Sequence, residues 1–145
     1  MNVAAAILAP LVVALFTGAP AFAQSDTANT PAVALKGYDV VAYFSEHHPS
    51  KGSSDISQDF DGVRYYFSTA RNRTAFSADP DHYMPQFGGY CAMGISKGKK
   101  FEADPTIFRI VEGKLYVFSS PKAGDASDQD PEILARARRA WDTLK

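Results

Sequence analysis

Two segments of the chain share one pattern, in which two runs of strand-forming residues flank a two-residue turn that ends in glycine. In the first segment, SQDFDGVRYYFST, the turn is Asp61-Gly62. In the second, TIFRIVEGKLYVFSS, the turn is Glu112-Gly113, and β-branched and aromatic residues dominate both runs. Asp-Gly between alternating runs is the strongest short-range signal for a hairpin. The pattern predicts two antiparallel hairpins, which any fold of this chain must accommodate.

The segment DPEILARARRAWDTL predicts a C-terminal helix. Asp130 suits the N-cap and Pro131 suits the first helical position, where the missing N–H costs nothing. Its apolar residues fall on one stripe: Ile133, Leu134, Ala137, Trp141 and Leu144. A one-sided stripe of this kind packs against a core, here expected to be a sheet.

Shorter helices are expected between these elements. Asp39 is a candidate N-cap for one, and Ser68 for a second that Pro80 ends. A third begins near Cys91, whereas residues 121–129 are expected to form a loop. No internal repeat is apparent. The predicted fold is α+β, a small single domain in which two antiparallel hairpins pack against short helices and a C-terminal helix.

Length and charge narrow the classes of function. The chain has 145 residues, which favours one domain, and 46% of them are hydrophobic, enough for a real core. Its 15 Lys and Arg against 16 Asp and Glu give a formal net charge of −1. Proteins that track phosphate backbones need a basic excess, so nucleic acid is not an expected partner.

The first 23 residues carry no charged side chain and contain a long apolar run that ends in Ala21-Phe22-Ala23. Small residues at this spacing are typical of a cleavable signal peptide. We therefore expect a signal peptide at 1–23, a linker at 24–33, a domain at 34–145, and a periplasmic or secreted protein. An uncleaved membrane anchor is the alternative, but Pro10 and Pro20 interrupt the run, and no stable span is expected after cleavage.

Cys91 is the single cysteine, in the stretch QFGGYCAMGIS. With one thiol no internal disulfide can form, so the domain must be held together by its core. In an oxidising compartment an odd cysteine indicates an intermolecular partner, a metal ligand or a reactive group. Gly88-Gly89 permits a sharp turn that presents Cys91 at the start of a helix.

Four soft or imidazole side chains lie between residues 82 and 93: His82, Met84, Cys91 and Met93. Sulfur ligands suit copper(I), and imidazole suits copper or zinc. The leading hypothesis is therefore a soft metal site, copper above all, with Cys91 as the anchoring thiolate and the other three as co-ligands. A second copy of the chain could complete such a site, which makes a homodimer a further expectation. No CxxC or HxxxH spacing supports a closed structural zinc site.

Other roles for Cys91 remain open. A thiol at a helix N-terminus is activated by the backbone dipole, which favours a redox or peroxide-responsive protein. The sequence has no second cysteine that could act as the resolving thiol. A cysteine hydrolase would need His82 as its base. An aromatic pocket near Tyr90 could instead hold a small molecule or a partner. Finally, Cys91 could be buried and inert.

The stretch FDGVRYYFSTARNRTAFSADPDHYM resembles the YHS domain, and LKGYDVVAYF and PQFGGYCAMGISKGK resemble exported bacterial YHS-domain proteins. The resemblance covers most of residues 34–118. Its matching positions are Gly62, Tyr65, Phe67, Phe76, Ala78-Asp79-Pro80 and Tyr83.

The resemblance implies a metal-handling scaffold, because some relatives carry cysteines as metal ligands in the first turn and at the junction between strand and helix. The corresponding positions here are Ala42, Ser68 and Asn72, and none is a cysteine. A metal role must therefore depend on Cys91. The expected function is that of an exported, non-catalytic protein that binds or buffers copper through Cys91, with thiol redox chemistry or a binding module as alternatives.

Overall fold

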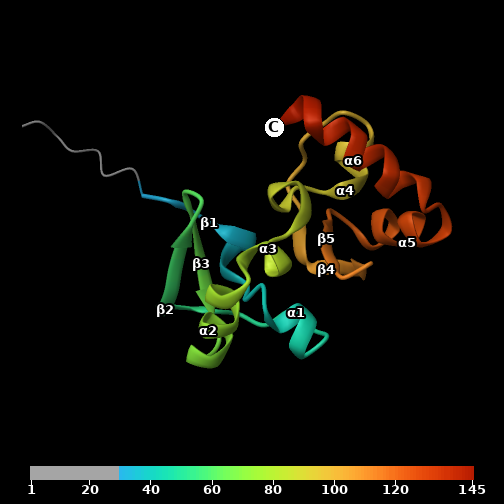
Figure 1. The fold of residues 1–145 in the computed structure, drawn as a ribbon. Helices are drawn as coiled ribbons and strands as arrows, with labels where there is room; N and C mark the ends of the chain where they lie inside the picture. Colours follow the sequence, from blue (N-terminus) through green and yellow to red (C-terminus); the bar gives the residue numbers. More distant parts are fainter. Residues whose placement is uncertain (1–29) are drawn as a thin grey trace, which may run out of the picture.

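The computed structural model describes residues 30–145, and it contains both predicted hairpins (Figure 1). The first hairpin joins β2 (Ser53–Phe60) to β3 (Val63–Phe67), and β1 (Ala32–Val33) pairs in parallel with β3. The second joins β4 (Asp104–Val111) to β5 (Lys114–Phe118). Both turns have positive φ angles, 49° at Asp61 and 53° at Glu112, each followed by a positive-φ glycine. This twist matches that of the flanking strands.

Short helices surround the two sheets, and the predicted α+β single domain is confirmed. The α-helices are α1 (Ala42–Ser45), α2 (Ala70–Ala78), α3 (Pro80–Tyr83), α4 (Ala92–Ser96), α5 (Pro121–Gln129) and α6 (Glu132–Leu144), and the 3₁₀ turns are η1 (Ala34–Gly37) and η2 (Gln86–Gly89). The expected signal peptide and most of the linker lie outside the described residues, while the linker's last two residues form β1. None of the described helices has the length and apolar character needed to cross a membrane.

The chain is built from two copies of one unit, which corrects the expectation of no repeat. Each copy runs through a 3₁₀ turn, a short helix, a hairpin, a nine-residue helix and a final helix. The hairpin turns at Asp61 and Glu112 lie 51 residues apart (112 minus 61). Residues 32–84 form the first half and residues 85–144 the second. In Figure 1 the first half is blue to green, and the second is yellow to red.

Hydrogen bonds and strand register repeat along with the elements. The register of each hairpin shifts at the same place, between Ser53 and Ser57 on β2 and between Asp104 and Phe108 on β4. Val33 pairs with β3 as Pro85 pairs with β5. The two halves agree even in the shift of strand register, so their architectures match in detail.

The caps of the longer helices also correspond. Thr69 accepts a hydrogen bond from the Asn72 N–H at 3.1 Å, and Ser120 accepts one from the Ala123 N–H at 3.3 Å. The N-cap of α2 is therefore Thr69. The prediction of Ser68 for this position is wrong. The predicted loop at 121–129 is α5, because Ser120 and a proline at the first position begin a helix there.

The last helix of each half begins at an Asp-Pro pair. Asp79 accepts a hydrogen bond from the His82 N–H at 3.3 Å and thereby starts α3, so Pro80 begins a helix as well as ending one. Asp130 accepts one from the Glu132 N–H at 3.0 Å, but the N-cap of α6 is Pro131, one residue later than predicted. The apolar stripe of α6 is buried chiefly against α4 and not against a sheet, which corrects the prediction.

A single continuous hydrophobic core spans both halves. Tyr43 on α1, in the first half, stacks edge-on against Phe108 on β4, with ring centroids 4.9 Å apart. Its hydroxyl donates a 2.7 Å hydrogen bond to the Pro105 carbonyl. The short helix of the first half is thus fixed to the sheet of the second, and the two copies form one domain.

Candidate functional site

Cys91 lies at the residue that precedes α4, and its exposed fraction is only 1%. The preceding turn has positive φ at Phe87 (57°), Gly88 (61°) and Gly89 (81°). The Cys91 N–H donates to the Phe101 carbonyl at 2.9 Å. The predicted glycine turn and the short helix after Cys91 are both confirmed.

The sulfur of Cys91 contacts one residue of the following hairpin, Ser119. The Ser119 N–H donates to Sγ at 3.2 Å, and the thiol is placed to donate to Ser119 Oγ at 3.4 Å. Ser119 lies between β5 and the cap of α5, and Cys91 also forms an isolated parallel bridge with Val117 on β5. Three elements, α4, β5 and α5, therefore converge on the thiol.

In the first half, the residue at the position of Cys91 is Asp39. The Asp39 N–H donates to the Ser50 carbonyl at 2.8 Å, as Cys91 does to Phe101. One carboxylate oxygen, Oδ2, accepts hydrogen bonds from both the N–H and the Oγ of Ser68, each at 2.8 Å. Ser68 occupies the place of Ser119, so the same backbone frame holds a carboxylate in one half and a thiol in the other.

The carboxylate of Asp39 is wholly buried and accepts two further hydrogen bonds. The Val41 N–H donates to Oδ1 at 2.9 Å, and Asn72 Nδ2 donates to Oδ2 at 2.7 Å. Asp39 was expected to cap α1, but its side chain instead ties the segment before α1 to the start of α2. Ser68 and Asn72, at which the resemblance places cysteines of metal-handling relatives, are engaged in this network.

A hollow lies beside Cys91 in the second half, where no side chain corresponds to the Asn72 amide. The counterpart of Asn72 is Ala123, whose methyl group is too short to reach the sulfur. The space beside Cys91, here called the Cys91 hollow, has a volume of about 430 Å³. It is lined by Cys91, Met93, Gly94, Lys97, Phe101, Ser119, Ser120, Lys122, Ala123 and Ala126.

The charged side chains that line the Cys91 hollow are both basic, Lys97 and Lys122, and no carboxylate lines it. Neither lysine forms an ion pair with any residue in the described part of the chain. Two unneutralised cations favour negative charge in the hollow and oppose a further cation.

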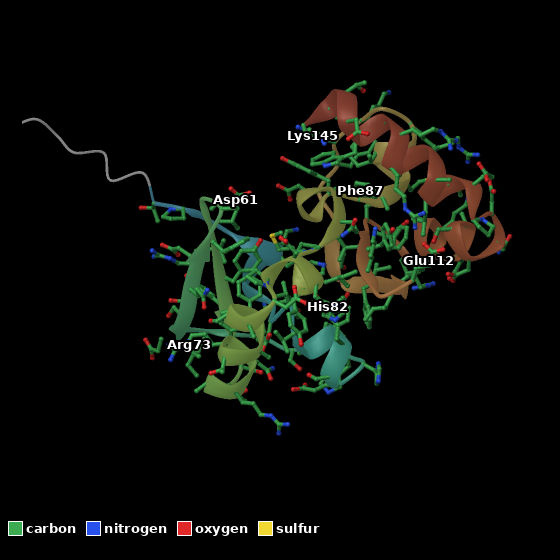
Figure 2. All side chains as sticks on the ribbon, in the orientation of Figure 1. Asp61, Arg73, His82, Phe87, Glu112 and Lys145 are labelled. Carbon is green, nitrogen blue, oxygen red and sulfur yellow. The ribbon has the colours of Figure 1, made fainter. Side chains whose placement is uncertain are left out.

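The structure brings together two of the four predicted metal ligands. Met93 lines the Cys91 hollow. Met84 lines a different hollow of about 460 Å³, and the His82 ring packs against Phe44 beside α1, with centroids 4.8 Å apart (Figure 2). Within residues 30–145, no group of three or more His, Cys, Asp or Glu residues is arranged to hold a metal ion.

Tyr90 precedes Cys91 but does not line its hollow. Its ring lies near Trp141, with centroids 6.4 Å apart, and the Lys100 ammonium lies 5.6 Å and 5.3 Å from the centroids of the Tyr90 and Trp141 rings. These contacts attach α6 to the turn before α4. The aromatic residue of the Cys91 hollow is instead Phe101.

The chain matches no protein-family model, curated protein or solved structure. The resemblance to the YHS domain accordingly stays a prediction. Sequence reasoning identified Cys91 and Met93 but missed Ser119, Ala123 and the two lysines. Aligning the two halves would have found Ser119, because it repeats Ser68 in the sequence Phe-Ser after each second strand.

Proposed function

We propose that this chain is an exported thiol-based redox protein in which Cys91 reduces a small peroxide. The observation that carries the proposal is the hydrogen bond from the Ser119 N–H to the sulfur, in a frame that holds the Asp39 carboxylate in the other half. Donors that suit a carboxylate also stabilise a thiolate, and the thiolate is the nucleophilic form of cysteine. Lys97 and Lys122 line the same hollow as the sulfur.

The chemistry requires only a peroxide and external thiols. The sulfur attacks the terminal peroxide oxygen, an S–O bond forms, and the O–O bond breaks. The departing oxygen takes up the proton that the thiol released, so that Cys91 becomes a sulfenic acid and the peroxide becomes an alcohol or water. One external thiol then forms a mixed disulfide and releases water, and a second frees the Cys91 thiol as a disulfide leaves.

Two features of the site support small oxidants. The sulfur is almost fully buried, so reagents reach it by way of the Cys91 hollow. The 145-residue sequence has no second cysteine that could form an internal disulfide with the sulfenic acid. Reduction of the sulfenic acid by external thiols is slow. Such a slow step fits a protein that responds to peroxide better than an enzyme that turns peroxide over rapidly.

Copper(I) binding is the second candidate, and the position of Met93 favours it. Cys91 and Met93 line the same hollow and offer two sulfur ligands, which suit copper(I). The lysines oppose a cation there, which places copper second. In this version of the site His82 and Met84 are not ligands, and any further ligand would come from a small molecule or a second copy of the chain.

The test compares the reduced protein with its Cys91→Ser variant. We expect hydrogen peroxide to convert Cys91 to a sulfenic acid, trapped by a dimedone-type reagent and located by mass spectrometry, with no trapped product in the variant. Copper(I) titration against a competing chelator, with a Met93→Leu variant, tests the second candidate. If the native thiol resists peroxide while both variants lose copper, the copper function replaces the redox one. If neither reaction occurs, Cys91 is an inert core residue and both proposals fail.

A further inference from the structure

The Cys91 hollow includes a residue of α5 that differs from its counterpart in the first half. In the first half, the Asn72 amide approaches the Asp39 carboxylate and donates to it at 2.7 Å. In the second half, the corresponding residue is Ala123, the third residue of α5. Its N–H donates the same capping hydrogen bond, but its side chain has no amide. At this position the first half therefore has an amide that donates to the buried acceptor, and the second half has a methyl group that cannot donate to the sulfur.

The opposite wall of the hollow is apolar and partly open to solvent. Phe101 occupies the place of Ser50 in the first half, and with an exposed fraction of 49% it is one of two exposed large hydrophobic residues among those described. Gly94 makes room for this ring, since a Cβ added there would come within 2.6 Å of Phe101 Cδ2. Together with Met93 and Ala126, Phe101 forms a surface for an apolar group of moderate size.

Positive charge lines the same space. Lys97 and Lys122 come from different elements, the residue after α4 and the start of α5, and both line the hollow. A ligand with a short apolar body and a negative charge would satisfy both features, whereas a neutral ligand with the same body would satisfy only the first.

We infer that the Cys91 hollow selects organic hydroperoxides that carry a carboxylate, in preference to neutral hydroperoxides of the same size. The inference rests on the proposed function and names its substrate class. The apolar body lies against Phe101 and Met93, the carboxylate lies toward the lysines, and the peroxide faces the sulfur. The reaction is that given above, with the hydroxy acid as the reduced product.

The test measures the second-order rate of sulfenic acid formation with three probes: hydrogen peroxide, a short-chain hydroperoxy carboxylic acid, and its methyl ester. We expect the acid to react about two- to fivefold faster than its ester at low salt, the effect of one exposed ion pair. The ratio should fall toward one in high salt. It should also fall in Lys97→Gln and Lys122→Gln, but not in Lys99→Gln, which removes the same charge outside the hollow.

A fourth variant, Ala123→Asn, tests the shape of the site by restoring the residue found in the first half. It should slow both organic probes more than hydrogen peroxide, because the amide occupies the part of the hollow beside the sulfur, as Asn72 approaches Asp39. Equal rates for acid and ester in the native protein would overturn the inference while leaving the proposed function intact. No oxidation by any probe would overturn the proposed function itself.

Discussion

Replacing Asp39 with alanine should destabilise the protein far more than the same change at Cys91. The substitution leaves the Val41 N–H, the Ser68 N–H and the Asn72 amide without their acceptor. A buried donor without a partner costs about 1–3 kcal/mol, so the three together cost at least about 3 kcal/mol. With a total stability of about 5–15 kcal/mol, such a variant still folds but with much of its margin lost.

Cys91→Ala is the matched control, because it removes the acceptor at the equivalent place in the second half. The sulfur is a weaker acceptor and receives one backbone hydrogen bond, from Ser119, so we expect a loss of about 1–2 kcal/mol.

Both losses are measured as free energies of unfolding by urea titration followed by far-ultraviolet circular dichroism. The reasoning is refuted if Asp39→Ala costs no more than Cys91→Ala, since the buried network would then contribute little. Asn72→Ala separates the parts: it should cost about 1.5–3 kcal/mol, the range for a hydrogen bond to a charged group.

Two further outcomes follow from burial and from close packing. Burial raises the pKa of the Tyr43 hydroxyl well above its ordinary 10.0, so the stability due to this group is complete below pH 10.0 and is lost as pH rises beyond it. Urea midpoints measured from neutral pH to pH 11 should fall at the alkaline end in the native protein, and less steeply in Tyr43→Phe. Gly52→Ala should destabilise by about 1–3 kcal/mol, because the new Cβ collides with the Tyr66 backbone, whereas Gly113→Ala meets open space and costs only about 1 kcal/mol for its positive φ. Thermal unfolding of both variants compares them, and an equal loss would contradict the packing seen at Gly52.

The elements that sequence reasoning predicted correctly are those specified by neighbouring residues. Asp61-Gly62 and Glu112-Gly113 define their turns locally, and Asp130-Pro131 defines the start of α6. The helix at 121–129 was missed because its polar, glycine-containing sequence is typical of loops, even though Ser120-Pro121 is a good helix start. Ser120-Pro121 indicates a helix start, but the prediction followed the loop-like composition of the segment.

The site could be predicted only in part, because its contacts join distant residues. Cys91 meets Ser119 only when α4 packs beside β5, and no local pattern encodes that approach. The repeat is not evident from the sequence because few positions are identical in the two halves. Two that are identical are Tyr65 with Tyr116 and Phe67 with Phe118. Burial and hydrogen-bond geometry were retained where residue identity was not.

The duplicated frame also bears on how such a thiol could arise. In a chain with a single copy, exchanging Asp39 for cysteine would sacrifice the carboxylate that ties the segment before α1 to α2. With two copies, one can keep that tie while the other varies at the corresponding positions, which here are Cys91 and Ala123. Redundancy of this kind lets a lineage try new chemistry in one copy while the other continues to support folding.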